Sequence, residues 1–251
     1  MLTTIICTYN MGTSSRIDGS DFLSKCLYSF YDTKRTDNPL IIIDDGSNDD
    51  TDSIIRSFII KGFPIQRYMR HPVNVGLKLS FNEAVFYCDT PYFIRVDADI
   101  VFTTPAWDTL LIKHMNKYKC CGVVGATQID HLKRVHSVGD KFYPYYHHLK
   151  KRIKGSHAVC ESVMGCFSCF RMEAWKKVNG ITCPQWLRCE TEDINLRIRK
   201  VGYEIHCLPW EFQHNHGLAN KKTGRYNDLE QQMKDIQEFM KKQHNITFYK
   251  E

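Results

Sequence analysis

The chain reads FIRVDADIVF at residues 93–102, and this stretch decides the fold that we expect. Apolar residues lead into Asp97 and Asp99, and apolar residues follow, which is typical of a buried strand that ends in an acidic turn. Ligands bind at such strand ends in α/β sheets. Carboxylates beside a buried strand are costly to desolvate unless a cation or several donors neutralise them. A divalent metal shared with a phosphate is the expected partner, and a solvated or helix-capping turn is the structural alternative.

The composition indicates one globular domain without a membrane span. The chain has 251 residues and a formal net charge of +6. No linker, low-complexity stretch or repeat divides it, and this length can bury a large core. Its start lacks a basic leader, and no apolar run is long enough to cross a membrane. Eleven cysteines are scattered at strand-like positions. We therefore expect a single unexported domain in a reducing, cytoplasmic compartment.

Strand and helix patterns alternate over the first half of the chain. Continuous apolar runs predict strands that are covered on both faces, and apolar residues at helical spacing predict amphipathic helices. The predicted strands are residues 3–8, 39–43, 65–69 and 92–96, and the predicted helices are residues 22–31, 54–62, 77–88 and 107–118. This order predicts an α/β fold with a mainly parallel central sheet and helices on both faces.

The second half has a more mixed pattern. Strand-like runs occupy residues 122–129, 163–170 and 204–208, with a helix that contains Ile194 and Ile198 before the last of them. The polar, aromatic and basic region at 130–160 is expected to be mobile or to face an acceptor. A final apolar stripe predicts a C-terminal helix that packs on the core, and its members are Leu229, Met233, Ile236, Phe239 and Met240.

Polar turns follow three of the predicted strands. They contain Thr8, Tyr9 and Asn10 after the first strand, Asp45 after the second, and Asp97, Ala98 and Asp99 after the fourth. The carboxyl ends of parallel strands lie side by side, so these turns should line one crevice. An aromatic ring beside a carboxylate suits a nucleotide base, because the ring stacks on it and the carboxylate accepts its imide hydrogen.

A further turn opens the predicted helix at residue 77. Asn74 and Gly76 precede it, so free backbone amides and Lys78 would face a phosphate there. Simple capping of the helix is the structural alternative.

Two other groups of residues suggest binding. Five cysteines between residues 160 and 189 include one Cys-x-x-Cys pair, but the segment CFSCF resembles a buried strand, which favours packing over zinc. A basic segment at residues 147–154 would suit a polyanionic partner, although solvated loops often carry such runs.

The ordered series of motifs resembles glycosyltransferase family 2. The matching stretches run in order from residue 3 to about residue 217, and they read TTIICTYN, IIIDDGSNDDT, NVGLKLSFNEA, FIRVDADIVF, VMGCFSCFRMEAWKKVNG, ETEDINLRIRKVGY and LPWEFQHNHG. The resemblance implies the GT-A fold and an inverting transferase that uses a nucleotide-diphosphate sugar. It also implies a nucleotide-sugar-binding half at residues 1–102 and an acceptor-binding half with the C-terminal helix at residues 103–251.

The resemblance assigns a role to several residues. Thr8 and Tyr9 match the loop that holds the base, Asp45 the carboxylate that reads it, Asp97 a position near the ribose, and Asp99 the ligand of Mn²⁺ or Mg²⁺. Asp193, with Glu192 beside it, matches the general base. His214 or His216 matches a metal-binding histidine, and the register favours His214.

One departure from the family is informative. No Gln-x-x-Arg-Trp pattern follows the histidines, and this pattern accompanies processive, membrane-embedded members. We therefore expect one sugar to be added per encounter. The acceptor stays open between a glycan or lipid-linked glycan, a protein, and a modified base of DNA as in viral genomes, so a viral or a bacterial origin is compatible. A haloacid-dehalogenase-type phosphatase and a non-catalytic nucleotide-sugar or glycan binding module are the alternatives.

Overall fold

An 11-stranded sheet forms the centre of the protein in the computed structural model. The structure describes residues 1–13, 21–129, 135–136, 152–154, 157–184, 190–215, 235, 238–239 and 241–243. Its strands are β1 (Leu2–Thr8), β2 (Leu40–Asp44), β3 (Arg67–Arg70), β4 (Tyr92–Asp97), β5 (Ile100–Val101), β6 (Cys121–Ile129), β7 (Val135–His136), β8 (Arg152–Lys154), β9 (His157–Cys160), β10 (Phe167–Arg171) and β11 (Glu204–His214). Its helices are α1 (Phe22–Thr33), α2 (Thr51–Ile60), α3 (Leu77–Phe86), α4 (Trp107–Lys117), α5 (Met172–Lys177) and α6 (Glu190–Lys200).

The sheet combines a parallel part with a mixed part. The main strand order is β3-β2-β1-β4-β10-β6-β11-β9-β8, while β5 pairs with β11 and β7 with β6. Strands β3, β2, β1 and β4 are parallel neighbours. Strand β10 is antiparallel to both β4 and β6, and β11 is parallel to β6. Consequently β4, β6 and β11 all point the same way, and their carboxyl ends lie at the same edge of the sheet.

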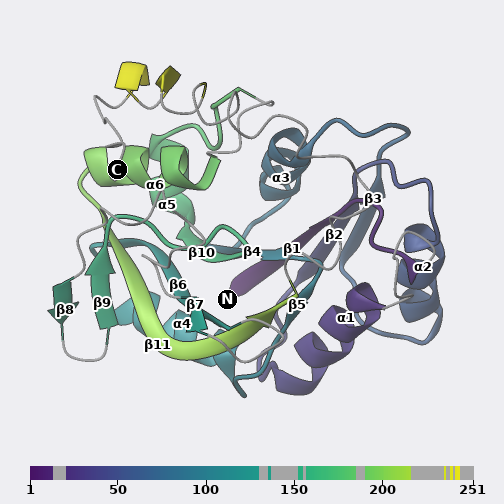
Figure 1. Ribbon diagram of the computed structural model, residues 1–251. Coiled ribbons are helices and arrows are strands. Elements are labelled where there is room, and N and C mark those ends of the chain that lie inside the picture. The colour runs from purple at the N-terminus through teal and green to yellow at the C-terminus, as the bar shows by residue number, and fades with distance from the viewer. Residues whose placement is uncertain are drawn as a thin grey trace.

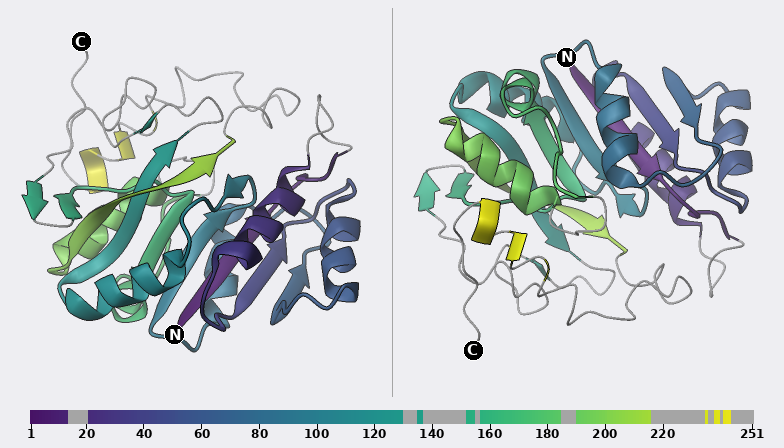
Figure 2. Two further views of the ribbon diagram at one scale, coloured as in Figure 1. Left: turned by 90° about the horizontal axis from the view of Figure 1, so that it is seen from below. Right: turned by 90° about the horizontal axis from the view of Figure 1, so that it is seen from above.

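Helices cover both faces of this sheet (Figures 1 and 2). Helices α1, α2 and α4 pack on one face, and α3, α5 and α6 pack on the other. Strand β2 shows how the sequence serves both layers, because Leu40 and Ile42 face the first core while Ile41 and Ile43 face the second. Each such buried aliphatic side chain contributes about 1.5–3 kcal/mol. The expectation of an α/β fold with a mixed sheet and helices on both faces is confirmed. The sheet is not mainly parallel, however, because six of the ten strand pairings among the described residues are antiparallel, and most of these involve strands of the second half of the chain.

Some element boundaries differ from those expected. The apolar run 163–170 is buried, but only its second part is a strand, and β10 begins at Phe167. An apolar run indicates burial and does not by itself distinguish a strand from a buried turn. Strand β11 continues to His214, beyond the expected end at residue 208, because its last part pairs with β5.

The C-terminal stripe and the basic segment fall largely outside the described residues. Phe239 is described and packs against the core of α3, α5 and α6, whereas Leu229, Met233, Ile236 and Met240 are not described. Of the basic segment 147–154, only the backbone of β8 is described. Within the described ranges, none of the helices is long and apolar enough to cross a membrane.

The cysteine cluster is part of the hydrophobic core. The ten described cysteines are all free thiols, and Cys160, Cys166, Cys169 and Cys183 are buried. Among the described residues, no group with converging metal-ligand atoms includes any of these four. Cys189 lies outside the described residues.

Candidate active site

The polar turns meet at one edge of the sheet, as expected from parallel strands. In the strand register, Thr8 of β1 lies beside Asp44 of β2, and Cys7 lies beside Asp97 of β4. The loops after β1 and β2 are also bonded to each other. The amide of Asn10 donates to Ser47 Oγ (2.9 Å), and the Asn10 side-chain oxygen accepts from the amide of Asn48 (3.0 Å). Asn10 has a φ of +50°, a left-handed conformation that Asn tolerates better than most residues.

Asp97, Asp99 and His214 form a group of potential metal ligands at this edge. Their ligand atoms all lie within 4.8 Å of one another. His214 Nε2 is 3.2 Å from Asp99 Oδ1. Two carboxylates and an imidazole are a donor set that suits Mn²⁺, and the two carboxylates also suit Mg²⁺. The residues present therefore fit the divalent ion that the sequence predicts.

The pairing of β5 with β11 brings these ligands together. His214 lies opposite Ile100, the residue after Asp99. Asn215 then donates two hydrogen bonds to the Asp99 carbonyl, one from its backbone amide (3.2 Å) and one from its side-chain amide (3.0 Å). Burial on its own lowers the pKa of His214, but the adjacent Cys166 and Asp99 outweigh it and raise this pKa.

Arg95 links the acidic turn to helix α6. Its side chain is buried, with Nε 3.2 Å from Asp97 Oδ1 and Nη1 3.6 Å from Glu190 Oε1. Burial opposes the charged guanidinium, but the carboxylates of Asp97 and Glu190 outweigh it and raise the pKa of Arg95. The first turn of α6 also approaches Gly165 closely, because a Cβ there would lie 2.1 Å from Thr191 Oγ1. The amino-terminal end of α6 is therefore held beside the acidic turn.

The two carboxylates expected to act as the base and its neighbour lie on α6. Asp193 is buried, and its Oδ2 accepts from Arg197 Nε (3.0 Å) and Nη2 (2.9 Å), one turn later in the helix. Arg197 in turn donates to the carbonyls of Val178 and Gly180, which fixes the ion pair against the loop after α5. Glu192 is partly buried.

Asp45 is deeply involved in the local structure. Its Oδ1 accepts from the amide of Val75 (3.0 Å) and contacts His71 Nδ1 (2.9 Å), while its Oδ2 accepts from the amide of Gly76 (2.8 Å). The other ring nitrogen of His71 lies 2.7 Å from Glu83 Oε2. A carboxylate has about four acceptor positions, so Asp45 can still accept one hydrogen bond from a ligand.

Several groups expected to bind phosphate at the start of α3 have partners within the protein. The amides of Val75 and Gly76 donate to Asp45 and are not free for a phosphate. The ammonium group of Lys78 is buried and donates to the carbonyl of Pro184. Asn74 is exposed, and its backbone packs against Gly46. These contacts fix the loop before α3, and binding of a phosphate by Asn74, Gly76 and Lys78 stays a prediction.

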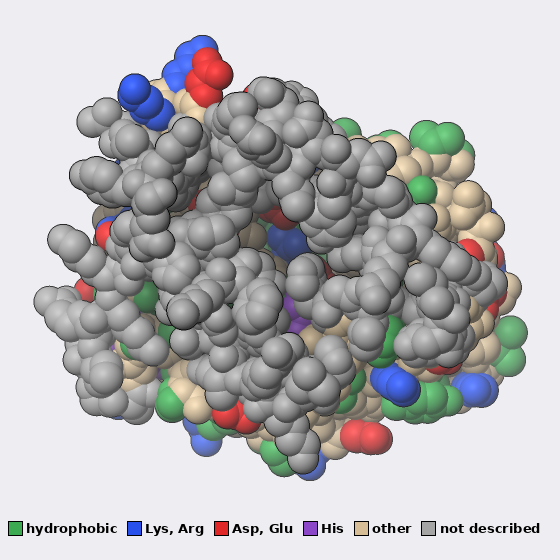
Figure 3. All heavy atoms as spheres, in the orientation of Figure 1, with side chains coloured by type: hydrophobic (Ala, Val, Ile, Leu, Met, Phe, Trp, Pro, Cys, Tyr) green, Lys and Arg blue, Asp and Glu red, His purple; other side chains and the backbone are tan. Residues whose placement is uncertain are grey.

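The remaining expected residues are distributed around the same edge. Thr8 is buried, Tyr9 is partly buried and Ala98 is buried within the acidic turn. His216 lies outside the described residues, whereas His214 is placed against Asp99. Acidic, basic and histidine side chains are visible together near the middle of the face that Figure 3 shows.

The sequence reasoning missed Arg95, Glu190 and Asn215. Arg95 carries a usable signal, since a charged residue inside an otherwise apolar strand requires a buried partner. Glu190 and Asn215 carry no such signal, because their positions depend on how α6 and β11 are placed against β4 and β5.

Comparison with known families gives a match over most of the chain. Residues 3–178 match the model of glycosyl transferase family 2. The match covers β1 to α5, whereas α6 and β11 lie beyond it. No curated protein matches the chain in sequence.

Several solved structures share this fold at low sequence identity, and their chains are longer than this one. A mannosyltransferase, PcManGT from Pyrobaculum calidifontis in complex with GDP-Man and Mn²⁺, has a TM-score of 0.64 and 17% identity over 89% of this chain and 58% of its own. S. aureus TarS 1-349 has a TM-score of 0.63 and 14% identity over 85% of this chain and 60% of its own. GalNAc-T7 with UDP, GalNAc and Mn²⁺ has a TM-score of 0.67 and 13% identity over 86% of this chain and 44% of its own. The chain thus spans about half the length of these structures.

Proposed function

The chain belongs to glycosyltransferase family 2 and has the GT-A fold, and we propose that it transfers one sugar from a nucleotide-diphosphate donor to an acceptor hydroxyl with inversion. The observation that carries the proposal is the group of Asp97, Asp99 and His214 at the carboxyl edge of the sheet. The similar structures include one with GDP-Man and Mn²⁺ and one with UDP-GlcNAc, so a nucleotide-sugar donor is the natural substrate class.

Asp97, Asp99 and His214 would hold Mn²⁺ or Mg²⁺ at this edge. When bound, such an ion neutralises the charge that develops on the diphosphate leaving group. The loop with Thr8, Tyr9 and Asn10 is proposed to hold the base, because it is bonded to the β2 loop beside Asp45. Asp45 would accept the imide hydrogen of the base at its remaining acceptor position.

Asp193 is the proposed general base. Its carboxylate is held in place by the ion pair with Arg197, and it would accept the proton of the acceptor hydroxyl. The hydroxyl oxygen would then attack the anomeric carbon opposite the diphosphate, and one displacement inverts that carbon. Glu190 is the alternative base, because it contacts Arg95 directly beside Asp97.

A donor screen tests this proposal. Thermal shift with Mn²⁺ across uridine, guanosine and thymidine diphosphate sugars should identify one donor that stabilises the wild type and stabilises Asp99→Asn much less. Release of the nucleoside diphosphate is then measured for wild type, Asp193→Asn and Glu190→Gln. Loss of turnover with donor binding retained is expected for Asp193→Asn alone. The same loss in Glu190→Gln with full activity in Asp193→Asn would move the base to Glu190.

The acceptor is proposed to be a glycan or lipid-linked glycan, with protein and DNA as further candidates. A steep loss of acceptor affinity with added salt would favour DNA. The family match decides against the phosphatase alternative. Donor binding without turnover over a broad acceptor panel would instead support a binding module. The free thiols favour a reducing compartment as the setting of the enzyme.

A further inference from the structure

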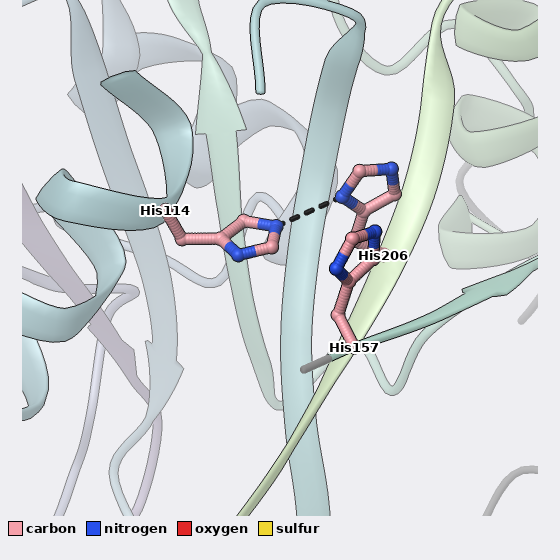
Figure 4. A group of neighbouring side chains, drawn as sticks. All are labelled: His114, His157 and His206. Carbon is pink, nitrogen blue, oxygen red and sulfur yellow. Dashed lines mark hydrogen bonds between the residues drawn. The ribbon is translucent and has the colours of Figure 1, made fainter. Parts of the chain in front are cut away.

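A second cluster of histidines lies away from the candidate active site. His114 is in the last turn of α4, His157 is the first residue of β9, and His206 is near the start of β11 (Figure 4). All three are buried. His206 and His214 belong to the same strand, and at about 3.3 Å per residue they are separated by about 26 Å along it. The cluster is therefore separate from the group formed by Asp97, Asp99 and His214.

The three imidazoles face one another. The rings of His157 and His206 stack with centroids 4.2 Å apart, and His114 meets both nearly edge-on, at 5.0 and 5.1 Å. Each ring offers one ligand nitrogen such that the three atoms lie within 4.8 Å of one another. Burying three polar rings together is costly when apolar side chains of similar size would fill the same space. This cost suggests that the site has a ligand.

We propose that His114, His157 and His206 form a second metal site, which binds Zn²⁺ or a similar transition ion and fastens α4 and β9 to β11. Three imidazoles are a known ligand set for Zn²⁺, which completes its tetrahedron with a water molecule. With Zn–N bonds of about 2.1 Å, the nitrogens of such a site are about 3.4 Å apart. The rings of His157 and His206 are stacked, so they must rotate on binding until their nitrogen lone pairs converge on the ion.

The hydrogen bonds of His206 prepare it as a ligand. Its Nε2 lies 3.0 Å from Glu204 Oε2, and its Nδ1 lies 2.8 Å from His114 Nε2. A carboxylate accepts, so His206 Nε2 carries the hydrogen and the lone pair of Nδ1 points toward His114. A carboxylate that orients a histidine from behind is the usual support of a metal-bound imidazole.

Binding would replace the hydrogen bond between the two histidines. His114 donates its Nε2 hydrogen in the ion-free arrangement, so it must lose this proton and regain one at Nδ1, with no net change in protonation.

A second group of potential metal ligands lies next to the cluster. Cys120 is exposed, and its Sγ lies 3.4 Å from Glu204 Oε2. Cys120, Glu204 and His206 form a further group with ligand atoms within 4.8 Å of one another. Cys120 and Glu204 therefore define a competing position for the ion on the other side of the His206 ring.

Cobalt titration tests the proposal in a background without the first site. Chelator-treated His214→Ala protein is titrated with Co²⁺, whose visible absorption reports tetrahedral nitrogen ligands. We expect one equivalent to bind and to be displaced by Zn²⁺. Adding His157→Phe, which keeps a ring of similar size in the stack, should remove the signal. Tyr118→Phe is the matched control, because Tyr118 contacts all three rings without offering a metal ligand in the group, and it should bind Co²⁺ normally.

Three outcomes would overturn the assignment. The first is the absence of a cobalt spectrum in His214→Ala, and the second is an unchanged spectrum after His157→Phe. The third is a sulfur-to-cobalt charge-transfer band that Cys120→Ser abolishes, which would place the ion on Cys120, Glu204 and His206. If His157→Phe fails to fold, the titration of His214→Ala and of Cys120→Ser still decides between these positions.

Discussion

Replacing Asp45 by Asn tests how strongly the loops at the carboxyl edge of the sheet depend on one carboxylate for their stability. Asp45 accepts from two backbone amides, at 3.0 and 2.8 Å, and contacts His71 at 2.9 Å. Asn has one acceptor oxygen, so it can serve Val75 or Gly76 but not both. If it keeps the bond to Gly76, its NH₂ group faces the amide of Val75, and two donors then oppose each other.

The magnitude follows from these three contacts. One backbone donor is left unsatisfied, which costs about 1–3 kcal/mol, and the bond that remains changes from charged to neutral, which costs about 1 kcal/mol more. His71 can shift its tautomer and accept from the NH₂ group, so its contact is partly retained. Because Val75 is only partly buried, water offsets some of the loss. We therefore expect Asp45→Asn to lower the free energy of unfolding by about 2–3 kcal/mol.

Urea denaturation measures this change, with Asp37→Asn as the control. Asp37 is exposed, so its replacement should change stability by less than about 0.5 kcal/mol. Affinity for the donor found in the thermal-shift screen is measured in parallel, and it should fall, because the carboxylate would also read the base. A stability loss as small as that of the control would refute the structural reasoning. Normal donor affinity in a destabilised variant would separate the two roles and leave Asp45 as a support of the loop.

Three further predictions concern the same region. The pKa of His71 is raised, because the neighbouring carboxylates outweigh its burial. The contribution of His71 to folding stability is therefore fully present below about pH 6.5 and is lost as the pH rises through the raised value. The urea midpoints of wild type and His71→Gln should converge between about pH 6 and pH 9. Arg95→Met leaves Asp97 without its buried cation and should lower the free energy of unfolding by about 3 kcal/mol in chemical denaturation. Arg95→Lys should lower it less, and equal losses in the two variants would argue against a role for the charge. Gly46→Ala should lower the free energy of unfolding by at least about 2 kcal/mol, because Gly46 has a φ of +75° and a Cβ there would lie 2.3 Å from the carbonyl carbon of Val73. A change within about 0.5 kcal/mol in thermal or urea unfolding would contradict the tight packing of the two loops.

Much of the fold was predictable from local patterns. Runs such as Leu40–Asp44 are apolar at every position up to the terminal carboxylate, which is typical of a strand that is covered on both faces. A series of these runs separated by amphipathic helices requires parallel strands, whose carboxyl ends meet at one edge. The place of Asp97 and Asp99 at that edge was therefore implied by the residues on either side of them.

The sequence by itself thus determined the layered sheet and the edge where its polar turns gather, since both follow from residues that are near neighbours in the chain. The partners of those turns were decided only by tertiary structure. Pairing of β5 with β11 carries His214 to Asp99, and the approach of α6 to β4 sets Glu190 against Arg95. Likewise, Asp45 binds the loop before α3, and three histidines that are far apart in the sequence meet where α4 and β9 approach β11. Hydrophobic periodicity specifies which face of an element is buried, but it does not specify which other element will cover that face.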